Sequence, residues 1–497
     1  MKQLIFYITL FFLILAFSTM ATSFDFDLWA RLIAGMGVID GGHVLTEDFL
    51  SYTPVHTWWD HEWGAGVIFY ALLKFLGPYS LIIFQAILIF LIFAIASRVV
   101  KLRTDRFFNI LFYFFGIMAL MPTLNNPIRC HLFSFLFFTV FIYILEKTRK
   151  QKSKLIYLTP FITLIWGNIH GGVVSGIGLL LIYTIGEALN KKPYKKYIVA
   201  LIISSLSLFI NPWGYEYVKF LIMANTMQRP NIVEWWGIFS SYHLHNFLEF
   251  KFFFIVLSIS QLVYIIKEYK ELGFKKWYES IDKTKYLIIL TTIYLAISHV
   301  KMMPFFVIAA ICFMYEDFYK IIKNIKLPQW KDKAIYAFIL AIAIFTLVSK
   351  DFSLPVGMDI YPIKEVEFIK INKLKGKLLT NFGYGSYAAY KLYPQNKIFM
   401  DGRYEEVYYD YMVPIQKEFF IARKPEYIME NFRPDVILIE NSYKDINNYL
   451  KKEWQKVYSG ENFGVYIPKD NNTKTFLQPT DNMDYYKTNL FATDIKF

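Results

Sequence analysis

The 497-residue sequence contains few cysteines and few charged residues for its length. Its two cysteines, Cys130 and Cys312, provide no disulfide framework, and charged residues make up only 19% of the chain. It contains no P-loop, dinucleotide-binding glycine fingerprint, zinc-protease helix or G-x-S-x-G elbow. These absences exclude a disulfide-stapled secreted domain and leave no motif of the common nucleotide-binding or hydrolytic enzymes.

Apolar residues are abundant instead: 56% of the chain is hydrophobic and 20% is aromatic. Apolar runs near the length that crosses a bilayer as a helix recur through the first 350 positions. We predict a mainly α-helical polytopic membrane protein with eleven spans, at 3–20, 79–99, 107–123, 131–146, 155–169, 172–189, 197–212, 252–268, 285–299, 303–318 and 334–350. We expect the first to be a retained anchor, because only Lys2 precedes it and no signal-peptidase site is evident.

The net charge of +13 follows from the loops between these spans. With the N-terminus inside, the short cytoplasmic loops hold 23 Lys and Arg residues and the opposite loops hold six. The bias predicts a multi-pass protein of the cytoplasmic (plasma) membrane, and it explains the positive charge without a nucleic-acid partner. The polar motifs then all fall on the extracytoplasmic side, which indicates one site there.

Composition divides the chain into a transmembrane domain, 1–350, and an extracytoplasmic α/β domain, 351–470. Within the first, 21–78 is a long external loop whose apolar segment 64–77 we expect to lie as a helix at the membrane surface. The second has short apolar runs typical of strands, at 377–381, 397–401, 435–440, 454–459 and 463–468. The tail 471–497 is polar, and we predict no structure for it.

The stretch FDFDLWAR places Asp25 and Asp27 just beyond the first span. One interpretation is an interfacial helix on which Asp27 pairs with Arg31 four residues later. The other is that a carboxylate at the membrane surface acts as a general base or holds a divalent cation.

WWDHEW, 58–63, encloses Asp60, His61 and Glu62 between tryptophans. Tryptophan is expected at a membrane interface in any case, but the two acids and the histidine are candidates for a second catalytic acid or a metal ligand. On a helix Asp60 and Glu62 would point to different faces, so we expect at most one of them to share a site with Asp27.

Cationic side chains occur at three outer turns. Arg129 and His131 open the fourth span, His170 lies in NIHGG, and His299 and Lys301 lie in SHVKMMP. They are candidates for binding a lipid-linked phosphate as an electrostatic clamp on a leaving group. Snorkelling of the arginine and capping of helix ends are the alternatives.

Three further groups are weaker candidates. Asn211 lies in NPWG at the end of the seventh span, and Glu234 with Trp235 forms EWW in the next external loop, a combination that suits a sugar or a membrane belt equally. Asp401 and Arg403 end a predicted strand as DGR, where they suit substrate binding or a turn with a local ion pair.

Together these features resemble the GT-C superfamily of polytopic glycosyltransferases, which use polyprenyl-phosphate-linked sugars on the extracytoplasmic face. The resemblance is carried by one N-terminal span, a long first external loop with acids near its start, and a soluble domain after many spans. More narrowly, DFDLWARLIAGMGVI, TEDFLSYTPVHTWWDHEW, PIRCHLFSF, WGNIHGG, NPWG, EWW and DGRYEEVY are similar to a branch of bacterial and archaeal membrane proteins. The chain departs from the oligosaccharyltransferase branch, since it has no W-W-D-Y-G motif.

The resemblance implies an inverting transfer of a sugar from a polyprenyl-phosphate-linked donor to a lipid, glycan or protein acceptor. Asp27 matches the acid that precedes the tryptophan in that branch, so it is the expected base or metal ligand, with Asp25 as an extra acid and Glu62 or Asp60 as the second. His61 and Glu62 match its H-E-W element. The implied cofactor is a divalent cation, Mg or Mn, held by Asp25, Asp27 and His61 if it is present.

Two alternatives from other classes remain open. A transporter or flippase usually carries mid-membrane charges and pseudo-symmetric halves, and this chain shows few such charges and no internal duplication. A non-catalytic membrane scaffold would use the α/β domain to bind a partner. Acids of the first loop that face a cavity would favour the enzyme, and acids that face lipid would favour the scaffold.

Overall fold

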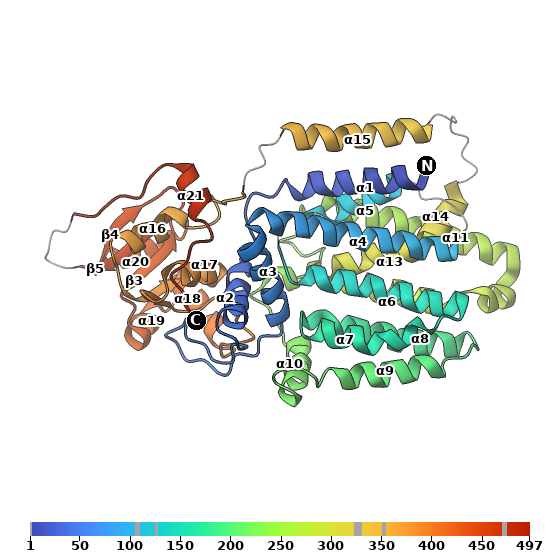
Figure 1. Ribbon diagram of the computed structural model, residues 1–497, viewed down its shortest axis with the longest axis horizontal. Coiled ribbons are helices and arrows are strands. Elements are labelled where there is room, and N and C mark those ends of the chain that lie inside the picture. Colours follow the sequence, from blue (N-terminus) through green and yellow to red (C-terminus); the bar gives the residue numbers. More distant parts are fainter. Residues whose placement is uncertain (1, 105–109, 125–127, 323–330, 350–353, 470–474) are drawn as a thin grey trace. The chain divides into compact units, whose positions relative to one another are not determined.

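The computed structural model describes residues 2–104, 110–124, 128–322, 331–349, 354–469 and 475–497. Most of these residues are helical, and one five-stranded sheet lies toward the C-terminus (Figure 1). They form two compact units: a helical unit, Met1–Ala21 with Ile82–Phe352, and a mixed unit, Thr22–Leu81 with Ser353–Phe497. This division differs from the predicted boundary at 350, because most of the first external loop belongs to the same unit as the C-terminal domain.

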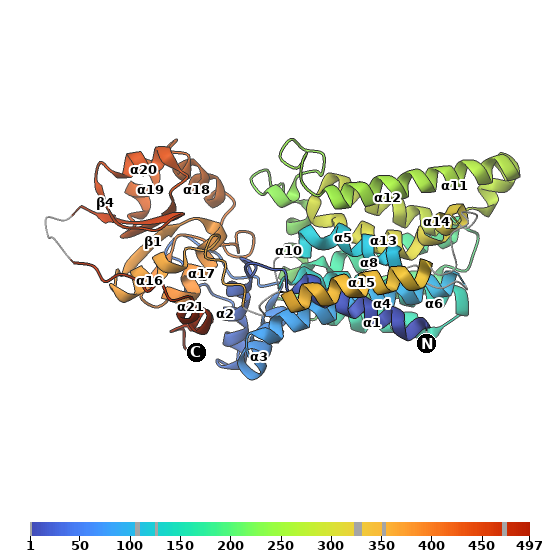
Figure 2. The same cartoon turned by 90° about the horizontal axis from the view of Figure 1, so that it is seen from above.

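The helical unit is a bundle of apolar helices, seen from two directions in Figures 1 and 2. Proline opens α7 and α13, where the first turn needs no backbone N–H donor. The helices are α1 (Lys2–Ser18), α4 (Tyr79–Arg103), α5 (Ile110–Leu124), α6 (His131–Gln151), α7 (Thr159–Gly167), α8 (Val174–Leu189), α9 (Lys195–Ser207), α10 (Tyr215–Thr226), α11 (Leu248–Ser280), α12 (Lys283–Ser298), α13 (Met303–Phe313), α14 (Tyr315–Ile322) and α15 (Lys331–Ser349). Single 3₁₀ turns at Lys154–Leu158, Gly171–Val173, Val233–Trp235 and Val300–Met302 precede or connect them.

Each of the eleven predicted spans overlaps a helix, but the number of spans is not confirmed. Among the described residues, four helices are long and apolar enough to cross a membrane, or five if the bent pair α13 and α14 counts as one span. Several of the others are too short by themselves: a 17-residue helix such as α1 is only about 25 Å long at 1.5 Å per residue. Helices and composition thus indicate a membrane protein. The first three residues of the predicted span 107–123 and the predicted loop residues 105, 106 and 323–330 lie outside the described part.

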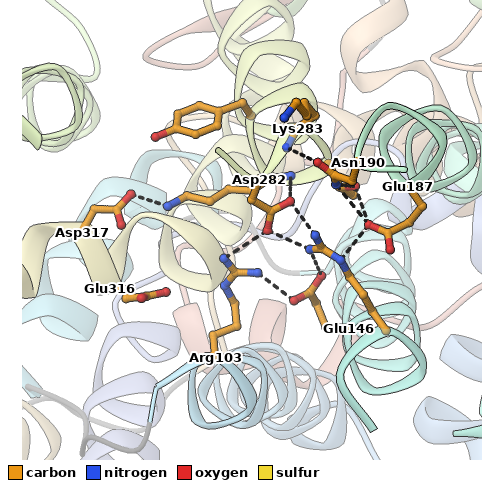
Figure 3. Close-up of polar contacts among 12 residues, drawn as sticks. Arg103, Glu146, Glu187, Asn190, Asp282, Lys283, Glu316 and Asp317 are labelled. Carbon is orange, nitrogen blue, oxygen red and sulfur yellow. Dashed lines mark hydrogen bonds and ion pairs between the residues drawn. The ribbon is translucent and has the colours of Figure 1, made fainter. Parts of the chain in front are cut away.

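A buried ionic network joins four helices of this unit (Figure 3). Arg149 donates to both carboxylate oxygens of Asp282, at 2.6 and 2.8 Å, and its Nε lies 2.8 Å from Glu187. Arg103 donates to Glu146 at 2.7 Å, and Glu146 is fully buried. The loop arginines were predicted only to orient the protein in the membrane; these two also pair with acids inside the bundle.

The mixed unit is built around a sheet of order β2-β1-β3-β5-β4, in which β1, β2 and β3 are parallel and β5 and β4 are antiparallel to their neighbours. The strands are β1 (Gly376–Thr380), β2 (Asn396–Ile398), β3 (Val436–Glu440), β4 (Trp454–Ser459) and β5 (Phe463–Pro468), close to the five predicted runs. The first loop adds to the β2 edge: Leu50 O accepts from Ile398 N, and Tyr52 N donates to Ile398 O. This backbone pairing is one reason why the loop and the domain form one unit.

The helices of this unit are α2 (Leu28–Ile39), α3 (Trp63–Leu76), α16 (Ile363–Ile371), α17 (Phe382–Leu392), α18 (Met412–Phe420), α19 (Pro425–Phe432), α20 (Lys444–Leu450) and α21 (Met483–Asn489). Helices α18 and α19 are separate, because Ala422 between them has a left-handed backbone and Pro425 starts a new helix. Segment 63–76 is helical as predicted.

The described part of the tail, 475–497, has structure that its polar composition did not predict. Lys391 on α17 donates to the carbonyl oxygens of Asn489 and Ala492, both at 2.7 Å, and the ring of Phe491 packs against Trp29 of α2. Composition gives little sign of these contacts, because several of the hydrogen bonds go to tail carbonyls, which any residue type supplies.

Helices α2 and α3 pack closely enough to require glycine at their crossing. A Cβ added to Gly35 would lie 2.2 Å from Gly66 O, and one added to Gly66 would lie 2.4 Å from Arg31 O. Residues Leu28–Gly37 of α2 are all buried, so α2 is surrounded by protein and does not present a single apolar face. The crossing fixes where Arg31 lies relative to the start of α3.

Gly35→Ala is therefore expected to destabilise the protein by about 1–3 kcal/mol through overpacking. Thermal unfolding of the detergent-solubilised protein measures the loss. Gly178→Ala is the matched control, because it is also a helical glycine but nothing lies within 4 Å of its added methyl group. Equal melting temperatures of the two variants would show that the crossing tolerates a side chain.

Glu365 on α16 is 4% exposed, with its carboxyl group against Gly460. Burial raises the pKa of Glu365 from 4.5 to about 7. The folded state therefore holds this proton more tightly than the unfolded chain, so the stabilisation is complete below about pH 4.5 and is lost as the pH rises to about 7.

Glu365→Gln should remove this pH dependence and raise stability above pH 7 by up to about 3 kcal/mol. Melting temperatures of the wild type and the variant, measured from pH 5 to 8.5, test the expectation. Glu426→Gln on exposed α19 is the control and should leave the pH profile unchanged. A wild-type pH profile in Glu365→Gln would contradict the assignment.

Candidate functional site

Arg31 is the centre of a buried cluster of charges in the mixed unit. It lies in the first turn of α2, is 2% exposed, and its guanidinium donates to both oxygens of Glu406 at 3.0 and 2.9 Å. It also forms an ion pair with the fully buried Asp60, and its Nε lies 3.3 Å from Glu62. The structure thus pairs Arg31 with three acids, Asp60, Glu62 and Glu406. The sequence spacing had suggested a different partner, Asp27.

Local structure holds these acids in place. Asp60 accepts the backbone N–H of Glu62 at 2.9 Å, which closes the turn that leads into α3. Trp58 donates its indole N–H to Glu406 at 2.9 Å, and the backbone N–H of Trp59 donates to Glu406 O. Asp60 and Glu62 therefore share one cluster around Arg31, because this piece is a turn and not the helix on which they would point to different faces.

His61 lies in the same cluster. Its Nδ1 is 3.1 Å from Glu406 and its Nε2 is 3.6 Å from Glu62. Burial opposes a charged imidazole, but the two carboxylates outweigh it and raise the pKa of His61 to about 9. Burial likewise raises the pKa of Asp60 to about 6 against the opposing effect of Arg31, whereas Arg31 and His61 hold the pKa of the buried Glu406 well below its ordinary value.

Asp401 and Arg403 form a second buried ion pair. Arg403 Nε donates to both oxygens of Asp401 at 3.0 Å, and its Nη1 donates to Asp48 of the first loop at 2.8 Å. The guanidinium also lies 4.5 Å from the ring centroid of Trp58. The local ion pair that the DGR motif suggested is present, and Asp48 extends it into a link between the first loop and the sheet domain.

Asp25 and Asp27 have different surroundings. Asp25 is buried and accepts the backbone N–H of Asp27 at 3.1 Å, as the first residue of a turn that starts α2. Asp27 is partly exposed at the N-cap of α2. Its Oδ1 lies close to Gly402, where an added Cβ would approach it to 2.6 Å. Only Asp27 of this pair is accessible enough to meet a substrate.

In the helical unit, the predicted cations of the loops gather around Glu234 and Trp235. Arg129 donates to both oxygens of Glu234 at 2.7 and 3.1 Å. Burial opposes the ionised carboxyl, but Arg129 and Lys301 lower the pKa of Glu234 to about 2. Lys301 lies 5.3 Å from the ring centroid of Trp235, and the carbonyl oxygen of Trp235 lies 2.7 Å from His299 Nδ1.

His170 occupies a capping position. Its Nδ1 accepts the N–H of Gly172 at 2.9 Å and lies 2.6 Å from the Ser134 hydroxyl, which in turn accepts from Trp166. A Cβ on Gly172 would lie 2.3 Å from Ser134 Oγ, as expected for a glycine at a close approach. The contacts of His170 favour the helix-end alternative.

The remaining candidates are placed by local packing. His131, at the start of α6, packs against the ring of Phe135 at 5.1 Å. Asn211 accepts the N–H of Trp213 and donates to Leu208 O, so its side chain closes the turn after α9. The amide oxygen of Asn211 and one of its N–H donors are therefore used within this turn.

Sequence reasoning missed Glu406, Asp48 and Arg229. Glu406 lies in the quoted stretch DGRYEEVY, and its distance from WWDHEW along the chain hid the contact. Arg229 lies 4.3 Å from the ring centroid of Trp235, the same ring that Lys301 approaches. The acids of DGRYEEVY and the tryptophans of WWDHEW could have been noted as candidate site residues. A single sequence does not show that the two motifs are in contact.

Only some of the candidate acids lie close enough to other ligand groups to hold a metal ion. Among the described residues, the group of His, Cys, Asp and Glu side chains that could hold a metal ion is His61, Glu62 and Glu406, with ligand atoms all within 4.8 Å of one another. The predicted set of Asp25, Asp27 and His61 is not such a group. The oxygens of Glu406 already accept hydrogen bonds from Arg31 and Trp58. A metal ion bound here would require neutral His61, so it would replace a proton on the imidazole.

Comparison with known proteins places the fold. No protein-family model matches the sequence, and no curated protein matches it significantly. The structure is similar to the oligosaccharyltransferase of Archaeoglobus fulgidus, with a TM-score of 0.55 and 9% identity over 87% of this chain and 69% of that chain. The mycobacterial arabinofuranosyltransferase AftD gives a TM-score of 0.48 and 10% identity over 95% of this chain, which spans 40% of that longer protein. At 9% identity, the likeness to the archaeal oligosaccharyltransferase shows a shared fold.

Proposed function

We propose that the protein is a membrane glycosyltransferase that moves a sugar from a polyprenyl-phosphate-linked donor to a hydroxyl group of a lipid, glycan or protein acceptor. The observation that carries the proposal is Asp27: a partly exposed carboxylate at a helix N-cap, next to a buried charge cluster, on a fold shared with an oligosaccharyltransferase. The extracytoplasmic face, the predicted site of the reaction, follows from the distribution of Lys and Arg.

In the proposed step, Asp27 accepts the proton of the acceptor hydroxyl as its oxygen attacks the anomeric carbon of the sugar. The bond between that carbon and the phosphate oxygen breaks, the configuration inverts, and the lipid phosphate leaves with the electron pair. Gly402 matters because any side chain there would press on Asp27. The Arg31 cluster holds the start of α3 against α2, and Asp60 and Glu62 act there as positioning residues.

We assign phosphate binding to the cations beside Trp235 in the helical unit, Lys301 and Arg229, with Arg129 oriented by Glu234. A phosphate group carries negative charge, and fixed cations around it favour its binding. Lys301→Met should accordingly raise KM for the lipid-linked donor or lower the turnover number, with the fold intact.

For the divalent cation, we propose His61, Glu62 and Glu406 as the ligands, with neutral His61 supplying a ring nitrogen. If so, Mn²⁺ at millimolar concentration should raise the melting temperature of the wild type, because a ligand of the folded state stabilises it. EDTA should reverse the rise, and His61→Gln should abolish it. Equal responses to Mn²⁺ in the wild type and in His61→Gln would remove the cation from this cluster.

The transfer assay tests the function directly. Purified protein in nanodiscs is incubated with radiolabelled polyprenyl-phosphate sugars and membrane lipid or glycan acceptors, and products are separated by mass spectrometry. We expect a new glycoside and free polyprenyl phosphate in equal amounts. Uptake of the lipid-linked sugar into proteoliposomes without any new glycoside would favour the transporter instead.

A further inference from the structure

A cavity of about 550 Å³ opens in the mixed unit at the carboxyl ends of β1 and β3. Asn381 and Gly383 follow β1, and Glu440 to Ser442 end and follow β3. The volume is within the range of ligand pockets.

The topology explains why a cavity forms here. The chain leaves β1 through α17 to reach β2 on one side, and then returns to β3 on the other side of β1. The connections therefore diverge between β1 and β3, and such a switch point leaves a crevice at the carboxyl ends of the parallel strands. Open α/β sheets bind their ligands at this position.

The lining disfavours a phosphate or another anion. Three of the lining residues are acids, Asp359, Glu440 and Glu461, and no base is among the lining residues of the described chain. The start of α17 offers little as an anion site, because Asn381 Oδ1 accepts the N–H of Gly383 and Gln416 accepts that of Phe382.

The same lining suits a sugar. Two of its lining residues are aromatic, Tyr384 and Phe463, and their rings lie edge to face with centroids 5.3 Å apart. The Glu440 carboxylate is oriented by the hydroxyls of Ser442, at 3.1 Å, and of Tyr384, at 3.4 Å. Carboxylates accept from hydroxyls, amides both donate and accept, and the faces of sugar rings stack on aromatic rings.

We propose that this cavity binds a neutral sugar residue of the acceptor glycan, with Glu440 accepting from sugar hydroxyls and the edges of Tyr384 and Phe463 contacting the ring. Phe26 on its rim is the residue between Asp25 and Asp27, so the cavity and the proposed base share one stretch of chain. Naming the acceptor as a glycan rests on the proposed function, whereas sugar binding itself does not.

The test is saturation-transfer NMR of the full-length protein in nanodiscs with neutral pentasaccharides of glucose, mannose, galactose and arabinose. We expect at least one pentasaccharide to bind saturably, and we expect that added pyrophosphate does not displace it. Glu440→Gln should weaken binding at least about tenfold. Gly383→Leu should abolish it by filling the cavity, and it should fold, because the nearest atom to an added Cβ is 3.5 Å away.

Glu430→Gln, on the exposed end of α19, is the control of equal charge change and should bind as the wild type does. No binding by any pentasaccharide, unchanged binding in both cavity variants, or displacement by pyrophosphate or Ca²⁺ would each overturn the proposal. The result is independent of catalysis: Asp27→Asn should still bind the sugar, and failure of the transfer assay alone would leave this site in place.

Discussion

Replacing Asp27 with asparagine is expected to lower the rate of sugar transfer by about 100- to 10,000-fold, the range typical for loss of a general base. Asparagine has the same shape and cannot accept the acceptor proton. It is as good an N-cap as aspartate, so α2 should form as before. Single-turnover transfer in nanodiscs, with the melting temperature measured on the same samples, separates the two effects.

Asp25→Asn is the matched control, two residues away. Its amide oxygen can still accept the backbone N–H of residue 27, so the turn should remain and transfer should fall by no more than a few-fold. A folded Asp27→Asn variant with full activity would remove Asp27 as the base. Equal losses in both variants would indicate that the turn, and not the carboxylate of Asp27, is what matters.

Much of the fold could be predicted from the sequence, because its signals are local. The five short β-branched and aromatic runs became the five strands, and each apolar run coincides with a helix. Glycine in DFDLWARLIAGMG proved to be a crossing residue, at Gly35. The number of spans could not be settled in this way, since helix length depends on where each helix ends against its neighbours.

The candidate site was less predictable, because its contacts are long-range. Arg31 and Glu406 are 375 positions apart, and one sequence does not reveal that a first-loop helix packs on a C-terminal domain. The i,i+4 rule offered Asp27 as the partner of Arg31, but helix packing supplied three other acids. The division of the chain by contacts differs from the predicted domains for the same reason: membrane topology groups residues by side, and packing groups them by contact.

The Arg31 cluster carries the second large effect. Glu406→Ala removes two hydrogen bonds to the buried guanidinium of Arg31 and the bond to Trp58. Breaking a buried ion pair costs about 3–5 kcal/mol, because the remaining charge has been taken out of water without its partner. For a unit of this size, that should lower the melting temperature by roughly 10 °C or more. Differential scanning fluorimetry of the solubilised protein measures the shift.

The double variant Arg31→Met, Glu406→Leu distinguishes loss of a pair from loss of packing. Apolar groups of similar volume avoid the desolvation cost, so the double variant should be more stable than Glu406→Ala, although Asp60 then loses its cation and limits the recovery. Asp410→Ala, on the exposed turn nearby, should leave the melting temperature unchanged. If Glu406→Ala has the melting temperature of the wild type, we infer that water solvates the guanidinium of Arg31 when the Glu406 carboxylate is absent. The cluster would then be an accessible ionic site, better suited to contact substrate than to hold α2 and α3 in position.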